Sequence, residues 1–510
     1  MTAFEVTGTL EVPVTYTFII CMEGKQMSKD LRTYLQQLQE RYPDHLKIVD
    51  KEVDPKWEIT AMVEKLRREQ NGFPAVLFCN VKGSNLPVLI NLAGSYERLA
   101  LAIETNVKNM VPEYARREGN FTAPKEVDRG EAPVKEVVWT GDQVDLRKLP
   151  IVWHNELDSG YYVDAGPAIV KDPDTGKQNA GIYRHELQAK DELGFMSNPA
   201  HHGSYVLRRY REMGQPMEVA IAVGHHPAWP MAGVSKLGGI GGELEVAGGL
   251  LGEPLEVVQG ETVDLLVPAR AEIVIEGVLD TDPEKLRHEG PFGEYPRFYT
   301  GVGLMPWLKV TAITMRRDAI YQTVFNAHTE HTCLGALPRM GSLFRRVREV
   351  IPTVTMVNLP VSGMGRGHAY ISMKKARDGE PKQVAFAAFA VDPLVKHVFV
   401  VDDDVDVFNE EEVLWCMCTR FQADRDLAII PFALDGHLSP NNYDIDRDER
   451  SEDRHKKVMA TKMILDLTKP APPTFYPTPC AVPEEVVQRA DTADLKPFEG
   501  LEQILRPRTA

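Results

Sequence analysis

The chain has 510 residues and a formal net charge of −16, and 43% of its residues are hydrophobic and 26% charged. This length is too great for one hydrophobic core, so we expect a globular protein of two or three domains. The acidic charge argues against a nucleic-acid or anionic-membrane partner, because the phosphates of such a partner would be repelled.

The first residues give no pattern for export or membrane insertion. The longest early apolar run, VTYTFIIC at 14–21, is far shorter than the roughly 20 residues that a spanning helix needs. The six cysteines are too few and too scattered for a disulfide framework or a zinc clip. We therefore expect a cytoplasmic protein whose natural start is either Met1 or Met27.

The N-terminal part divides into a β-prone extension at 1–26 and an α/β domain at 27–130. Ser28 is the predicted N-cap of the first helix. The segments KIVDKEVDP, PAVLFCNV and PVLINLAG are typical of strands, whereas WEITAMVEKLRRE and SYERLALAIETNV are typical of helices. The polar, proline-containing stretch at 113–136 predicts a linker.

The pattern changes at 131–330, where short β-prone runs are separated by glycine and proline. Examples are DAGPAIVKD, MEVAIAVG, EIVIEGVL and PWLKVTAITMRR. Such runs favour an antiparallel barrel or sandwich.

Helices and strands alternate again at 331–470, with a helix expected to begin at GSLFRRVREVIP, which starts at Gly341. This order predicts a second α/β unit, for which a doubly wound sheet is one arrangement. The final segment, 471–510, is rich in proline and ends in LKPFEGLEQIL. It is either an arm with a terminal helix that packs on a neighbouring subunit or a loosely ordered tail.

The stretch HEGPFGEY places two carboxylates, Glu289 and Glu294, on either side of a Gly-Pro-Phe-Gly turn. Neither a helix nor a strand would bring residues five apart together on one face. A tight loop built on Gly290, Pro291 and Gly293 would aim both acids at one point. The alternative is a surface turn with two solvated glutamates.

The central region also collects oxygen and nitrogen ligands for a metal. These ligands come from Asn179, from the two pairs His201–His202 and His225–His226, and from Glu243. The set has no sulfur and suits Mn²⁺ or Mg²⁺ better than a structural zinc ion. Each histidine taken alone is better explained as a hydrogen-bonded residue of the barrel than as a metal ligand, so the cluster carries the prediction and no single member does. The sequence contains neither a P-loop nor a GxGxxG motif, so neither familiar mode of nucleotide binding is supported.

Several motifs together resemble one known family. NAGIYR, AHHGS, GGELEVAGGLLGE, TVDLLVPARAEIVIEG, HEGPFGEY and KHVFVVDDDVD occur in the order found in the UbiD-like decarboxylases. The resemblance runs from about residue 130 to residue 440. It implies a reversible decarboxylase that uses prenylated FMN, with an N-terminal α/β unit, a central split β-barrel like that of flavin reductases, and a C-terminal α/β domain used in oligomerisation.

The same resemblance implies roles for individual residues. The catalytic set that it implies is Arg184, Glu289 and Glu294, with Glu294 as the proton donor and Glu289 holding Arg184 in place. The implied ligands of a divalent metal that tethers the flavin phosphate are Asn179, His201 and Glu243. Cofactor contacts fall on Asn179, Ile182, Tyr183, Arg184, Met231 and Lys396, of which Lys396 would contact the phosphate. The implied cofactors are prenylated FMN, Mn²⁺ or Mg²⁺, and K⁺.

The resemblance also implies a flavin prenyltransferase as the supplier of cofactor, and a homodimer is expected from symmetry, with higher homo-oligomers as an alternative. The substrate is expected to be a furan-, pyrrole-, indole- or phenazine-type carboxylic acid, with cinnamic, acrylic or hydroxybenzoic acids as the alternative. The candidate substrate residues are His328, His331, Phe432, Leu434 and His437.

Two functions of other classes remain open. A metal-dependent hydrolase would use the Asn, His and Glu cluster to activate water and would need no flavin. A flavin-binding protein without turnover is the second alternative, although binding alone does not require an acid and base trio.

Overall fold

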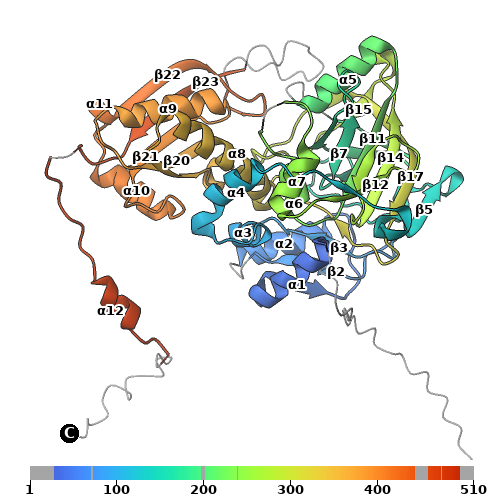
Figure 1. The fold of residues 1–510 in the computed structure, drawn as a ribbon, viewed down its shortest axis with the longest axis horizontal. Coiled ribbons are helices and arrows are strands. Elements are labelled where there is room, and N and C mark those ends of the chain that lie inside the picture. The colour runs from blue at the N-terminus through green and yellow to red at the C-terminus, as the bar shows by residue number, and fades with distance from the viewer. Residues whose placement is uncertain are drawn as a thin grey trace, which may run out of the picture.

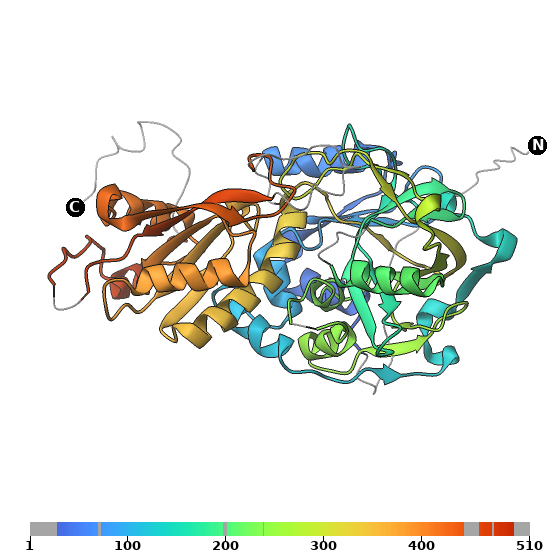
Figure 2. The same cartoon turned by 90° about the horizontal axis from the view of Figure 1, so that it is seen from above.

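The computed structural model describes residues 28–69, 73–196, 201–237, 239–442, 458–471 and 474–493. The predicted N-terminal extension and the predicted helix at LKPFEGLEQIL lie outside these residues. In Figure 1 the N-terminal elements, in blue, lie beside the curled central sheet, in green, and the C-terminal sheet forms a separate lobe in orange. Figure 2 shows the same lobe at one end of the molecule when the view is turned.

The N-terminal region combines helices with a small sheet. Its helices are α1 (Leu31–Arg41), α2 (Glu58–Arg68), α3 (Tyr96–Ala102) and α4 (Met110–Glu118), and its strands are β1 (Leu46–Val49), β2 (Ala75–Phe78) and β3 (Val88–Ile90). Strand β1 is parallel to β2, and β3 is antiparallel to β2. A distant strand, β18 (Tyr321–Gln322), pairs in parallel with β3 and completes the sheet.

Two details predicted for this region are wrong. Helix α1 is capped by Asp30 and not by Ser28, because the Asp30 carboxylate accepts a hydrogen bond from the Thr33 backbone N–H at 2.9 Å. The Thr33 hydroxyl returns the contact by accepting from the Asp30 N–H at 2.8 Å, which forms a capping box. The predicted linker begins too early, because α4 continues to Glu118 and buries Tyr114.

The central sheet has nine strands in the order β6-β9-β10-β17-β14-β11-β7-β8, and β5 pairs with β17. Every pairing between its strands is antiparallel, so the predicted antiparallel pairing is confirmed, and the sheet curls into a half-barrel. Its strands are β5 (Val137–Thr140), β6 (Tyr162–Val163), β7 (Pro167–Lys171), β8 (Gln178–Ile182), β9 (His185–Ala189), β10 (Glu192–Gly194), β11 (Met217–Val223), β14 (Ile273–Leu279) and β17 (Trp307–Met315).

Shorter elements surround the central sheet and carry much of the candidate site. The helices are α5 (His202–Met213), α6 (Ala228–Ala232) and α7 (Glu243–Leu251). A small sheet contains β4 (Lys125–Glu126), β12 (Glu256–Gln259) and β13 (Leu266–Pro268). A separate hairpin pairs β15 (Arg287–Glu289) with β16 (Gly303–Met305), and the stretch that joins these two strands holds Glu294.

The C-terminal sheet has five strands in the order β19-β20-β21-β23-β22. The inner pairings β20 with β21 and β21 with β23 are parallel, whereas both edge strands pair antiparallel. The strands are β19 (Val354–Asn358), β20 (His368–Met373), β21 (His397–Asp402), β22 (Leu427–Leu434) and β23 (Met459–Asp466). The helices are α8 (Thr329–Val350), α9 (Glu380–Val391), α10 (Glu410–Thr419) and α11 (Ala423–Asp426), and α12 (Glu484–Arg489) follows in the tail.

Helix α8 connects the three regions, and its predicted start at Gly341 is wrong. The helix begins at Thr329 and continues through Pro338, because a long apolar face is buried and outweighs the local cost of the proline. In its first turn, the Glu330 carboxylate accepts hydrogen bonds from backbone N–H groups of Asn91 (2.8 Å), Ala93 (3.0 Å) and Phe325 (2.7 Å). Glu330 therefore ties the start of α8 to both of the other regions.

Within the described residues, none of the helices has the length and apolar character that crossing a membrane requires.

Candidate active site

The loop that follows β15 makes its two acids converge, as the HEGPFGEY stretch predicted. Gly290 has φ +87°, and a Cβ atom at this position would lie 2.7 Å from the Gly301 carbonyl oxygen. Only glycine fits this backbone without displacing its neighbour. The Glu294 N–H then donates to the Phe298 carbonyl at 3.0 Å, which closes the turn and directs Glu294 back toward the sheet.

Arg184 lies between the two acids. It stands between β8 and β9 and is 6% exposed, and Glu289 is 1% exposed. The Nε and Nη2 atoms of Arg184 donate to the two Glu289 carboxylate oxygens at 2.7 Å each, and Nη1 donates to Glu294 Oε1 at 3.2 Å. The Glu289 contact is a two-point fork, which fixes orientation as well as charge. The structure therefore brings the three predicted catalytic residues into direct contact.

The electrostatics of this trio differ between its members. Burial raises the pKa of the Glu294 carboxyl, but Arg184 and other nearby positive charges outweigh burial and hold the pKa below its usual value. Burial alone would lower the pKa of the Arg184 guanidinium, but Glu289 reverses this effect and the pKa lies above its usual range. In the absence of a further anion, Glu294 is therefore ionised at neutral pH and Arg184 is charged.

Neighbouring side chains that no sequence motif indicates hold this trio in place. The Tyr162 hydroxyl donates to Glu289 Oε1 at 3.1 Å, and the Thr300 hydroxyl accepts from Arg184 Nη2 at 3.3 Å. The Asp158 carboxylate accepts a hydrogen bond from the Gly293 N–H at 2.7 Å, which fixes the loop between Glu289 and Glu294. These contacts join residues that are far apart in sequence, so no local pattern could have identified them.

A second polar cluster joins β8 to the N-terminus of α7. The Asn179 side-chain amide donates to Glu243 Oε1 at 2.7 Å, and the Ala180 N–H donates to Glu243 Oε2 at 3.2 Å. The Asn179 Oδ1 atom is buried without a hydrogen-bond partner. Burial raises the pKa of Glu243 to about 7, so this carboxylate lacks a strong positive partner. An unmatched amide oxygen beside such a carboxylate fits a divalent cation.

His201 and Lys236 lie close enough for their charges to interact. Burial lowers the pKa of His201 to about 4 and that of Lys236 to about 8, yet both side chains are accessible to solvent. No contact joins His201 to Asn179 or Glu243, and the described residues contain no cluster of three His, Cys, Asp or Glu side chains spaced for a metal ion. No sequence motif indicates Lys236.

The other predicted cofactor residues differ in their surroundings. Ile182 ends β8 and is half-buried. Tyr183 is buried, and its ring lies 5.9 Å from that of His201. Met231 is fully buried in α6. The Lys396 ammonium lies 2.9 Å from an Asp435 carboxylate oxygen, so its charge is balanced within the C-terminal region.

The predicted substrate residues do not form one group. His331 is in the first turn of α8, with its ring 6.4 Å from that of Tyr295, the residue after Glu294. His328 stacks on Phe325 with ring centroids 3.8 Å apart. In contrast, Phe432 and Leu434 lie on the edge strand β22 and are 71% and 64% exposed, and His437 follows that strand.

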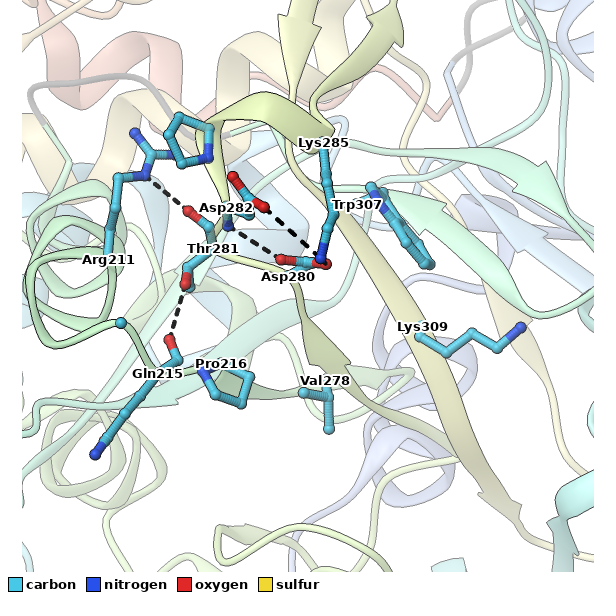
Figure 3. Close-up of a pocket in the computed structure, with 12 residues that line it drawn as sticks. Arg211, Gln215, Pro216, Val278, Asp280, Thr281, Asp282, Lys285, Trp307 and Lys309 are labelled. Carbon is cyan, nitrogen blue, oxygen red and sulfur yellow. Dashed lines mark hydrogen bonds and ion pairs between the residues drawn. The ribbon is translucent and has the colours of Figure 1, made fainter.

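Figure 3 shows a surface groove between α5 and the ends of β14 and β17. Its three cationic side chains are already engaged. Lys285 lies 2.9 Å from Asp280, Lys309 lies 2.8 Å from Asp191, and Arg211 Nε donates to the Thr281 carbonyl at 3.0 Å. The groove contains none of the predicted site residues.

Three family descriptions match the chain in order. The 3-octaprenyl-4-hydroxybenzoate carboxy-lyase N-terminal domain matches residues 37–118, the Rift-related domain matches 125–329 and the C-terminal domain matches 332–466. The matched stretches together contain all of the predicted site residues except His331, which lies between the second and the third stretch.

Several similar proteins agree with these matches. A phenolic acid decarboxylase from Sedimentibacter hydroxybenzoicus is 32% identical over 466 residues, which are 88% of this chain and 93% of the relative. A structure of the UbiD-class enzyme HmfF from Pelotomaculum thermopropionicum in complex with FMN has a TM-score of 0.80 and 37% identity, covering 93% of this chain and 98% of that one. An evolved dimeric form of HmfF in complex with prFMN has a TM-score of 0.78 and 37% identity, covering 89% and 97%.

Proposed function

This chain belongs to the UbiD family of carboxy-lyases, and we propose that it is a reversible, non-oxidative decarboxylase of an aromatic or heteroaromatic carboxylic acid. The observation that carries this proposal is the buried trio of Arg184, Glu289 and Glu294, in which one guanidinium contacts both carboxylates. A furan-, pyrrole-, indole- or phenazine-type acid is the substrate that we favour over cinnamic, acrylic or hydroxybenzoic acids.

Breaking the bond between a ring carbon and a carboxylate leaves an electron pair that amino-acid side chains cannot accept. Prenylated FMN, when bound, supplies the electron sink for this step. Arg184 is placed to hold the substrate carboxylate, and Glu289 keeps Arg184 charged and oriented. An anionic substrate beside Glu294 raises the pKa of this carboxyl, because two like charges disfavour each other. Glu294 thereby gains the proton that replaces CO₂ on the ring carbon.

The residues near the N-terminus of α7 have the chemistry needed to hold a divalent ion, and this ion would bind the phosphate of the flavin. Asn179 Oδ1 has no hydrogen-bond partner and the Glu243 carboxylate has no strong cation beside it, so Mn²⁺ or Mg²⁺ would satisfy both groups. We propose that His201 joins them as the third ligand, that Lys236 attracts the phosphate of the flavin, and that K⁺ binds nearby. Lys396 would contact the phosphate of the flavin only after it had given up its ion pair with Asp435.

The first prediction concerns this metal cluster. Glu243→Gln removes the negative charge that the cation requires, so we expect the purified variant to retain much less flavin and less Mn²⁺ than the unmodified protein. Glu245→Gln, two residues further along α7, is the matched control and should retain both. Flavin absorbance and metal content per protein molecule measure the effect. Equal flavin and metal in the two variants would refute the tether.

A second prediction tests the reaction. Protein produced together with a flavin prenyltransferase, the proposed supplier of cofactor, should release CO₂ from ring carboxylic acids, and protein that carries only FMN should release none. Activity without any flavin would favour the metal-dependent hydrolase, and flavin binding without turnover on a broad acid panel would favour a binding protein.

The remaining proposals concern assembly and location. Ile429, Phe432 and Leu434 expose apolar surface on the edge strand β22, which supports a homodimer or a larger homo-oligomer formed through the C-terminal region. We propose a cytoplasmic enzyme with no nucleic-acid or membrane partner, and domain limits of 27–130, 131–330 and 331–470.

A further inference from the structure

A buried acid holds the middle of the loop between Glu289 and Glu294. Asp158 is 3% exposed, and its Oδ1 atom accepts a hydrogen bond from the Gly293 N–H at 2.7 Å. Its Oδ2 atom accepts from the Asn155 N–H at 2.8 Å and from the Asn155 side-chain amide at 3.2 Å. Burial raises the pKa of the Asp158 carboxyl, and these hydrogen bonds oppose the rise. Burying a carboxylate costs free energy that neutral donors only partly return, so packing alone does not explain an acid here.

Residues 155–159, which we call the support segment, contact this loop at two further points. The Ser159 N–H donates to the Pro291 carbonyl at 2.8 Å. A Cβ atom on Gly293 would lie 2.6 Å from the Asn155 side-chain nitrogen, so the two segments can approach this closely only because residue 293 is glycine. The support segment therefore fixes the backbone of the loop at two neighbouring places.

These contacts fix two side chains of the loop that lie against Arg184. Phe292 stands between Pro291 and Gly293, and its ring centre is 5.0 Å from the Arg184 guanidinium carbon. Glu294 follows Gly293 and accepts a hydrogen bond from Arg184 Nη1 at 3.2 Å. A shift of the loop backbone would change both contacts. The support segment thereby sets the position of Glu294 relative to Arg184.

The N-terminus of helix α2 holds the support segment in turn. The Trp57 indole N–H donates to the Asn155 carbonyl at 3.2 Å, and the Trp57 backbone N–H donates to the Trp153 carbonyl at 3.0 Å. The Lys56 ammonium lies 4.4 Å from the centre of the Trp57 ring and 4.1 Å from that of Trp153, which adds two cation–π contacts. The N-terminal region is therefore joined to the chain that leads into the support segment.

The backbone of Trp57 is strained at this point. Its φ is +68°, in the left-handed region that bulky residues rarely adopt. Such strain persists where the surrounding contacts enforce it, and it is concentrated at functional sites. Trp57 is 40% exposed, so burial of its ring does not explain the strain. A fixed contact between the indole and Asn155 does explain it.

We propose that Asp158 and Trp57 are positioning residues for the proton donor Glu294, so that the N-terminal region takes part in the reaction through the support segment. This inference rests on the proposed function. The contacts run from Trp57 through Asn155 to Asp158. Asp158 then binds Gly293, the residue before Glu294. A displacement of about 1 Å at a reacting group lowers a rate by as much as about 100-fold, so a chain of short contacts such as this one has a direct effect on proton transfer.

The third prediction concerns proton transfer in two variants. Asp158→Asn keeps the size of the side chain but has one acceptor oxygen in place of two, so its bond to Gly293 or its bonds to Asn155 are lost. We expect kcat to fall by about 10- to 100-fold, with little change in KM or in flavin content. Trp57→Phe keeps a ring beside Lys56 and loses only the indole N–H, so we expect a fall of about 2- to 10-fold.

Steady-state kinetics in H₂O and D₂O separate positioning from general damage to the fold. The solvent isotope effect on kcat should increase in both variants, because proton transfer from Glu294 becomes the slower step. A smaller folded fraction would lower kcat and leave the isotope effect unchanged. The controls are Asp172→Asn, at a buried acid of the turn between β7 and β8, and Trp415→Phe, at a tryptophan of α10 that is 45% exposed. Both controls should leave kcat and the isotope effect unchanged.

A double variant tests whether Asp158 acts through Glu294. Glu294→Gln removes the proton donor, so the position of this side chain no longer affects proton transfer. Adding Asp158→Asn to Glu294→Gln should therefore lower the residual kcat little further. If the two losses multiplied, Asp158 would act independently of Glu294 and the proposal would be overturned.

Hydrogen exchange of the flavin-bearing protein, measured by mass spectrometry on the peptide that contains Gly293, tests the positioning without turnover. Exchange in this peptide should be faster in Asp158→Asn and in Trp57→Phe than in the unmodified protein and the two controls. Unchanged exchange in both variants, or faster exchange with an unchanged kcat, would overturn the proposal. If the unmodified protein decarboxylated no acid, the proposed function would fail, and faster exchange would still support the hold of Trp57 and Asp158 on the loop.

Discussion

Glu294→Gln is expected to lower kcat by about 10²- to 10⁴-fold, the usual contribution of a positioned proton donor. Glutamine keeps the shape of the side chain and can still accept the hydrogen bond from Arg184, but it has no proton to give. The flavin should remain bound, because Glu294 is separate from the Asn179 and Glu243 cluster. Steady-state kinetics and flavin absorbance on the same preparation measure both effects.

Glu186→Gln is the control for this experiment. Glu186 is a buried acid of β9 that accepts a hydrogen bond from the Gly290 N–H at 3.2 Å, and its glutamine variant keeps an acceptor for this bond. It does not contact Arg184, so we expect a much smaller loss than for Glu294→Gln. Unchanged turnover in Glu294→Gln would remove Glu294 from proton transfer.

Replacing Arg184 with methionine is expected to damage both stability and activity. The change leaves Glu289 buried without its partner, which lowers the free energy of unfolding by about 3–5 kcal/mol. We also expect kcat/KM to fall by about 10²- to 10³-fold, the effect of truncating a partner in a buried, hydrogen-bonded ion pair. Denaturant titration and steady-state kinetics measure these two quantities.

Two further variants separate the loss of stability from the loss of activity. In Arg184→Met with Glu289→Gln, the buried charge is gone, so stability should partly recover while activity stays low. Arg287→Met, at an exposed arginine of β15 paired with Glu192, should cost no more than about 1 kcal/mol. If Arg184→Met kept its rate, or if the double variant regained it, Arg184 would not bind the substrate carboxylate.

Part of the fold could be predicted because its pattern is local. Short β-prone runs separated by glycine and proline predicted the antiparallel pairing of the central sheet. The start of α8 could not be predicted, since Pro338 normally ends a helix and only tertiary packing shows that the helix continues. The pairing of β18 with β3 joins segments more than two hundred residues apart in sequence, which no local pattern reveals.

The candidate site shows the same division. Two glycines and a proline between Glu289 and Glu294 predicted a loop that aims both acids at one point, and both acids contact Arg184. Nothing in the sequence indicated Tyr162, because its contact with Glu289 joins residues that are far apart along the chain. Phe432 lies exposed on β22, and among the residues that the structure describes no contact links it to the catalytic trio. Its substrate role therefore stays a prediction.

Mass spectrometry of the small molecules released when the protein is denatured, after co-expression with a flavin prenyltransferase, tests the account most directly. We expect the mass of prenylated FMN in an amount close to one per chain, because the buried trio alone cannot accept the electron pair left by CO₂. Only unmodified FMN, or no flavin, from folded and metal-loaded protein would contradict the proposed decarboxylase.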